Sequence, residues 1–163
     1  MALHYNPAGL GWTDRAEVEG MYQKYVLDIG QGTLGFAHPI GERGAWGVSA
    51  SYLDYGSTNR TTITTVGGVV TGNSAGTYKG HDLAVGLSYG RHVADWSWGL
   101  TGKVINSKID DASATAFAAD LGLIWRAREV PFAIGLALQN LGSKMKYDVT
   151  KENLPLLGRM GAS

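Results

Sequence analysis

Few side chains in the sequence have the types and spacing that catalysis or metal binding requires. Ser88, His92 and Asp95 are the residue types of a hydrolytic triad, but no nucleophile elbow and no oxyanion glycine motif surrounds them. The adjacent Asp110 and Asp111 point to opposite faces of a strand or belong to a turn, so they form no carboxylate pair. The chain has no cysteine, and its histidines form no metal-binding motif: His4, His38, His81 and His92. We therefore expect no enzyme, no metal and no cofactor.

The composition excludes further classes of protein. Glycine occupies 24 of 163 positions and proline only 4, which disfavours helices without producing the composition of a disordered linker. The 14 basic and 14 acidic residues balance and form no block of like charge, so we expect no nucleic-acid partner. No apolar run reaches the roughly 18 residues of a membrane helix. The mean hydropathy of -0.08 is also typical of the alternating strands of an outer-membrane β-barrel.

Alternation of large and small side chains with a period of two predicts an all-β fold in a single domain, residues 1–163. Weaker strands are expected at 21–29 and 33–40, joined at Gly30-Gln31-Gly32, and a further strand within 154–162. Residues 56–80 lack the alternation and form either a long loop or a ragged hairpin about Gly67-Gly68. Clear alternation covers five segments: 45–55, 81–92, 95–110, 117–126 and 132–139.

The chemistry of the two strand faces separates a soluble fold from a membrane fold. A soluble sandwich or barrel turns its polar face, rich in Lys, Glu, Thr and Arg, toward water. Here that face is mostly Gly, Ala and Ser, which suits a crowded barrel interior, while the apolar face would meet lipid. Aromatic residues near the strand ends match the girdles of membrane barrels: Trp46, Tyr52, Tyr55, Tyr89, Trp96, Trp98 and Trp125. The pattern favours an antiparallel up-and-down transmembrane β-barrel, and a soluble ligand-binding β-barrel is the alternative.

The N-terminal residues 1–20 lead into the first strand and contain the motif Asn6-Pro7-Ala8-Gly9, which predicts a turn. The sequence YNPAGL around it resembles the N-terminal start of the FadL-like outer-membrane proteins, and within them the PorV/PorQ family. The resemblance continues in order through YGRHVADWSWGLTGKVINSKIDDASATAFAADLGLIW, IGLALQNLGSKMKY and LPLLGRMGAS. In this alignment of motifs, Lys103 and Asp120 match the family's recurrent lysine and its Asp-Leu-Gly aspartate.

The resemblance implies a bacterial outer-membrane protein. Members of that family are longer, so it implies that this chain is the N-terminal half of a barrel, a partial barrel of about 7–9 strands. Its implied function is non-enzymatic docking of cargo in type IX-type protein secretion, with FadL-like transport of hydrophobic small molecules as the alternative. The implied partners are outer-membrane lipid and secretion-system proteins or secreted cargo. Self-association through unpaired strand edges is also expected, because such edges are costly in lipid.

Three charged residues fall on the small-residue face and would line the barrel interior: Lys103, Asp120 and Arg126. On neighbouring strands, Lys103 and Asp120 can form a cross-strand pair that offsets the cost of burying charge. The other interpretation is that both side chains lie in a wet interior and contribute little. The Asn6-Pro7-Ala8-Gly9 turn would lie where the N-terminal segment meets the barrel, either as a gate or as a purely structural turn.

Overall fold

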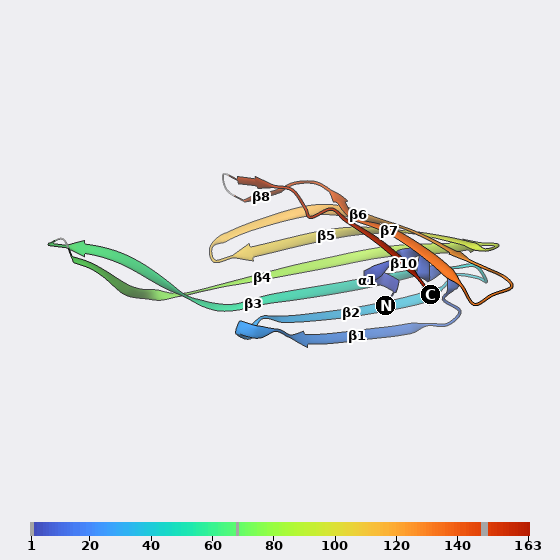
Figure 1. The fold of residues 1–163 in the computed structure, drawn as a ribbon, viewed down its shortest axis with the longest axis horizontal. Helices are drawn as coiled ribbons and strands as arrows, with labels where there is room; N and C mark the ends of the chain where they lie inside the picture. Colours follow the sequence, from blue (N-terminus) through green and yellow to red (C-terminus); the bar gives the residue numbers. More distant parts are fainter. Residues whose placement is uncertain (1, 68, 148–149) are drawn as a thin grey trace.

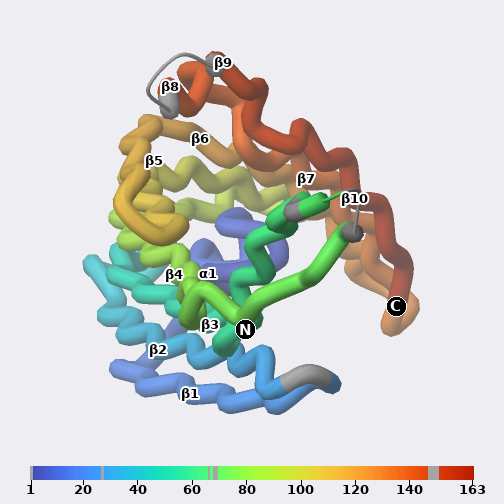
Figure 2. The backbone as a smooth tube through the Cα atoms, turned by 90° about the vertical axis from the view of Figure 1, so that its left-hand side faces the viewer, coloured from blue at the N-terminus to red at the C-terminus, as the bar shows by residue number. Residues whose placement is uncertain are grey.

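The computed structural model describes residues 2–67, 69–147 and 150–163, and its main feature is one antiparallel sheet curled into a half-barrel (Figures 1 and 2). Eight strands in the described residues form this sheet in the order β1-β2-β3-β4-β5-β6-β7-β10, so neighbours in the sheet are neighbours along the chain. Their bounds are β1 Glu17–Lys24, β2 Gly30–Pro39, β3 Gly44–Val66, β4 Val69–Val93, β5 Trp96–Ile109, β6 Ala112–Arg126, β7 Ala133–Gly142 and β10 Leu157–Ala162. The all-β, up-and-down prediction is confirmed.

The structure differs from the predicted strands in two details. The expected turn at Gly30-Gln31-Gly32 is wrong: these residues begin β2, and the connection from β1 is the short 3-10 helix η2, Val26–Asp28. Asp28 adopts a left-handed φ of 59°, so an aspartate supplies the turn conformation that glycine was expected to supply. Gly30 lies beside Tyr22, whose hydroxyl would be 3.2 Å from an added Cβ, whereas a Cβ at Gly32 would make an ordinary contact with the same ring at 3.9 Å. A small hairpin, β8 Met145–Tyr147 with β9 Thr150–Glu152, was not predicted.

Residues 56–80 form the hairpin alternative rather than a loop. They extend β3 and β4 far beyond the rest of the sheet, as an exposed arm that projects from one end of the half-barrel (Figure 1). Pairing continues to Val66 and Val69, with register shifts between Asp54 and Ser57 and between Asn59 and Thr61. The second turn residue expected from the sequence, Gly68, lies outside the described residues.

Burial on the two faces of the sheet is the reverse of that in a soluble protein, because large apolar side chains are exposed and polar ones are buried. On the convex face, large apolar side chains are exposed, such as Leu100 at 47% and Phe117 at 64%. On the concave face, small and polar side chains are buried, such as Thr101 at 1% and Asp120 at 2%. The cluster of buried apolar side chains is small and joins the N-terminal segment to β2 and β3: Leu3, Leu10, Ala37 and Ala45.

Aromatic side chains gather at the two ends of the convex face. At one end the rings of Trp96 and Trp125 are 6.4 Å apart and those of Tyr89 and Trp98 are 5.7 Å apart, because the antiparallel register places these strand ends side by side. At the other end, Tyr52 lies 5.7 Å from the ring of His81. Five of the seven predicted aromatics lie near the ends of their strands, Trp46, Tyr89, Trp96, Trp98 and Trp125, whereas Tyr52 and Tyr55 lie in the middle of β3, which continues to Val66.

Candidate functional site

The concave face holds the N-terminal segment, defined here as residues 2–12, which lies inside the curl of the sheet (Figure 2). It consists of helix α1, Ala2–Tyr5, and the 3-10 helix η1, Pro7–Trp12. Asn6 joins the two: its Oδ1 accepts from the Ala8 N–H at 3.0 Å, while its Nδ2 donates to the Leu136 carbonyl of β7, also at 3.0 Å. The Asn6-Pro7-Ala8-Gly9 motif therefore starts a helical turn and also ties it to the sheet.

A row of small residues across five strands makes room for this segment. The register aligns them directly, from β3 to β7: Ala45, Gly90, Gly99, Gly122 and Ala137. A Cβ at Gly99 would lie 2.2 Å from the Pro7 carbonyl carbon, and one at Gly122 would lie 2.0 Å from Asn6 Oδ1. Because real Cβ atoms do not approach so closely, the glycines are required where the N-terminal backbone crosses the sheet.

Polar and aromatic side chains fasten the other end of the segment. Ser97 Oγ donates to the Ala8 carbonyl at 2.5 Å, and His92 Nδ1 donates to the Gly11 carbonyl. The His92 ring also stacks on Trp12, with centroids 4.3 Å apart. The segment is thus held by β4 and β5 as well as by β6 and β7.

Ser88, His92 and Asp95 have three separate sets of partners. Ser88 Oγ shares a 2.8 Å hydrogen bond with Thr101 Oγ1, and His92 contacts the N-terminal segment. Asp95 pairs with Arg128 on the exposed rim, and Asp110 pairs with Arg60. These contacts give each group a structural partner.

Lys103 and Asp120 are brought together, with Lys103 Nζ 2.7 Å from Asp120 Oδ1 and both side chains largely buried. Asn140 completes the cluster: its backbone N–H donates to Asp120 Oδ1 at 2.9 Å, and its Oδ1 accepts from Lys103 Nζ at 2.6 Å. Asn140 has a φ of 63° and lies where the register of β6 and β7 shifts. The charged pair therefore stabilises a β-bulge, since the Asp120 carboxylate satisfies the backbone group that the ladder leaves unpaired.

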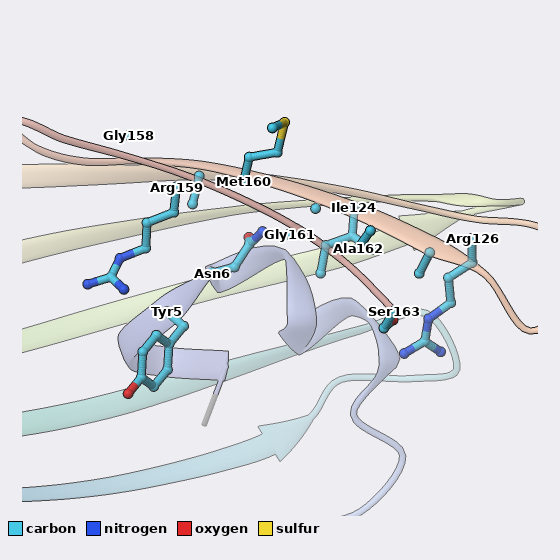
Figure 3. Close-up of a pocket in the computed structure, with 13 residues that line it drawn as sticks. Tyr5, Asn6, Ile124, Arg126, Gly158, Arg159, Met160, Gly161, Ala162 and Ser163 are labelled. Carbon is cyan, nitrogen blue, oxygen red and sulfur yellow. The ribbon is translucent and has the colours of Figure 1, made fainter.

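Arg126 lies apart from that pair. Its guanidinium stacks over the ring of Trp12 at 4.5 Å from the centroid, and it lines a cavity of about 650 Å³ between the N-terminal segment and strands β6, β7 and β10 (Figure 3). A second arginine, Arg159 of β10, lines the same cavity and stacks over Tyr5 at 5.2 Å. The three predicted site residues thus divide between two places, the bulge cluster and this cavity.

His4 is a titratable group of the N-terminal segment. Burial lowers the pKa of His4 below its ordinary value, while the Glu19 carboxylate 3.6 Å away acts in the opposite direction. The neutral imidazole is therefore the form that the folded segment favours.

Among residues 2–67, 69–147 and 150–163, no group of three or more His, Asp or Glu side chains is arranged to hold a metal ion. Within the same residues, no helix has the length and apolar character needed to cross a membrane.

The chain matches a known protein family over most of its length. Residues 3–155 match the model of the Uncharacterised protein family (UPF0164). The chain belongs to this family. No curated protein matches the sequence. The match includes the bulge cluster and all of the N-terminal segment except Ala2.

Several residues of the site were not predicted from the sequence, among them Tyr5, Trp12, Ser97, Gln139, Asn140 and Arg159. Gln139 links the N-terminal segment to β10, since its Nε2 donates to the His4 carbonyl at 3.0 Å and its Oε1 accepts from Arg159 Nε at 2.8 Å. A signal was present in the sequence, because Tyr5 and Trp12 flank the Asn6-Pro7-Ala8-Gly9 motif. Contacts between segments more than a hundred residues apart could not be derived from strand periodicity.

Proposed function

We propose that the chain forms part of the wall of a bacterial outer-membrane β-barrel, with its convex face against lipid. The reversed burial carries this proposal, because exposed apolar side chains over a whole sheet face would be unfavourable in water. On β5 the outward residues are apolar or glycine from Trp96 to Val104, about 26 Å along the strand at roughly 3.3 Å per residue. With a strand tilt of about 40°, this length gives an apolar band of about 20 Å, near the roughly 25 Å of known barrels.

The interior supports the same proposal. Small residues and hydrogen-bonded polar groups line the concave face, and the N-terminal segment fills part of it. The edge strands β1 and β10 each pair on one side only within the described residues. In lipid their free backbone groups require partners, and self-association through these edges stays a prediction that the size of the particle in detergent tests.

For the role of the barrel, the geometry favours passage of hydrophobic small molecules over cargo docking. A groove of about 490 Å³ on the convex face is lined mainly by apolar side chains: Leu121, Leu123, Leu136, Leu138 and Met160. The inner cavity lies on the same strands, and four residues line both spaces: Ala137, Gly158, Arg159 and Met160. The wall between the lipid side and the interior is therefore thin here, close to the β6–β7 bulge, which supports a lateral route.

Docking of secretion proteins or secreted cargo is the second candidate, as the resemblance to PorV/PorQ proteins implies. The exposed β3–β4 arm favours it, because the arm extends beyond the sheet and offers a surface outside the apolar band. A non-enzymatic role is common to both candidates.

The experiment that tests the transport proposal compares two outward glycines with open space around them, Gly158 in the groove and Gly102 on β5. Each is replaced by tryptophan, the protein is extracted in lipid nanodiscs, and bound hydrophobic small molecules are measured by mass spectrometry. We expect Gly158→Trp to lose them and Gly102→Trp to retain them. Equal retention would contradict the lateral route, and loss of captured secretion proteins when residues 59–77 are deleted would favour docking.

A further inference from the structure

The cavity between the N-terminal segment and β10 contains two cations without anionic partners. Among the described residues, neither Arg126 nor Arg159 lies within ion-pair distance of a carboxylate. By contrast, Lys103 on the same concave face is neutralised by Asp120. Both arginines are exposed, so their guanidiniums are accessible to a ligand that supplies negative charge.

Both arginines contact aromatic rings of the N-terminal segment. The guanidinium carbon of Arg126 lies over the Trp12 ring and that of Arg159 over the Tyr5 ring, 4.5 Å and 5.2 Å from the ring centroids. A guanidinium has five N–H donors, and this contact leaves donors free for a carboxylate or phosphate. One N–H of Arg159 already donates to Gln139, which holds the group in place.

The two arginines lie at opposite ends of the cavity (Figure 3). Arg126 pairs in register with Ala133 of β7, and Arg159 pairs with Ala137 of the same strand. The two arginines are therefore offset by four residues, about 13 Å along the strands. They are also about 10 Å apart across the sheet, because β6 and β10 lie on either side of β7. Between the arginines the concave-face lining is small or apolar apart from Asn6: Ile124, Ala133, Gly135 and Ala137.

We propose that this cavity binds an elongated organic dianion, an apolar chain with an acidic group at each end, held by Arg126 and Arg159. The proposal uses the interior cavity of the proposed barrel but does not depend on transport through the wall. A volume of about 650 Å³ is large enough for such a ligand.

The test is calorimetric titration of the full chain in non-ionic detergent with three probes of one length: dodecanedioate, dodecanoate and dodecanediol. We expect dodecanedioate to bind tightest and the diol weakest. Arg126→Gln and Arg159→Gln should each lower the binding affinity for dodecanedioate by about tenfold to a hundredfold, because each removes a charged hydrogen bond. The control is Arg128→Gln, an exposed arginine that pairs with Asp95 outside the cavity and should leave binding unchanged.

Two further measurements keep the outcome decisive. A series of shorter and longer diacids should give an affinity maximum at one length, which a single-ended or non-specific site would not show. If Arg126→Gln releases the N-terminal segment, Arg126→Lys retains a cation at that end and should bind the diacid more tightly than Arg126→Gln. Equal binding of the three probes, no binding of the diacid, or no effect of either arginine substitution would overturn the proposal, while leaving the lipid-facing assignment untouched.

Discussion

Replacement of Gly99 by alanine should dislodge the N-terminal segment from the sheet. The new Cβ would lie 2.2 Å from the carbonyl carbon of Pro7, 2.3 Å from its oxygen and 2.4 Å from the Ala8 nitrogen. An ordinary contact requires more than about 3.4 Å between carbon atoms, so the segment must move by about 1 Å or leave. Overpacking of this kind costs about 1–3 kcal/mol of stability.

The matched control lies three residues away on the same strand. Gly102 faces outward, and a Cβ there would meet no atom within 4 Å. Gly102→Ala should therefore be neutral or stabilising by up to about 1 kcal/mol, because alanine restricts the unfolded chain without a clash in the folded one. The two variants carry the same chemical change, and only their position relative to the N-terminal segment differs.

The assay is urea unfolding in detergent micelles, followed by far-UV circular dichroism, together with limited proteolysis of the N-terminal segment. We expect Gly99→Ala to lower the unfolding free energy and to expose the segment to protease, while Gly102→Ala changes neither. Equal stability and equal protection of the two variants would refute the packing of residues 2–12 against the glycine row.

Two other predictions follow from the buried polar groups. Lys103→Ala leaves the Asp120 carboxylate buried without its cation and should lower the free energy of unfolding in urea by about 3–5 kcal/mol. The control Lys108→Ala, at an exposed lysine, should leave it unchanged. Unchanged stability of Lys103→Ala would favour the wet-interior interpretation. Because the pKa of His4 is lowered in the folded state, the unfolded chain binds its proton more readily. Protection of the N-terminal segment from protease should therefore be full above the ordinary histidine pKa of about 6.5 and decrease as the pH falls below it, with a flat profile contradicting this origin.

The sequence predicted the strands well where large and small side chains separate onto opposite faces of the strand. In β5 and β6 the outward positions are mostly Trp, Leu, Val and Phe and the inward positions mostly Gly, Ser, Thr and Ala, so period and face could both be read from the sequence. The β1–β2 connection could not be read in this way. Glycine at 30 and 32 signals a turn locally, but both residues pair in register with β1 and β3 as the start of β2.

The candidate site was predicted only in part, for a similar physical reason. Lys103 and Asp120 lie on adjacent strands, and adjacency follows from an up-and-down order that the sequence indicates. Their third partner, Asn140, depends on a bulge with a left-handed φ, which no periodic pattern encodes. The contacts of Arg126 and Arg159 with the N-terminal segment depend on how the sheet curls, and that curvature is a property of the whole sheet.

The central claim is that the convex face meets lipid, and a scan of β5 tests it most directly. The chain has no cysteine, so single cysteines can be placed and spin-labelled at outward positions Leu100, Gly102 and Val104 and at inward positions Thr101 and Ile105. In lipid vesicles, the outward labels should collide often with oxygen and rarely with a water-soluble nickel chelate, and accessibility to oxygen should alternate with a period of two. Outward labels that collide with the nickel chelate as freely as a label at the exposed Glu129 would contradict the claim.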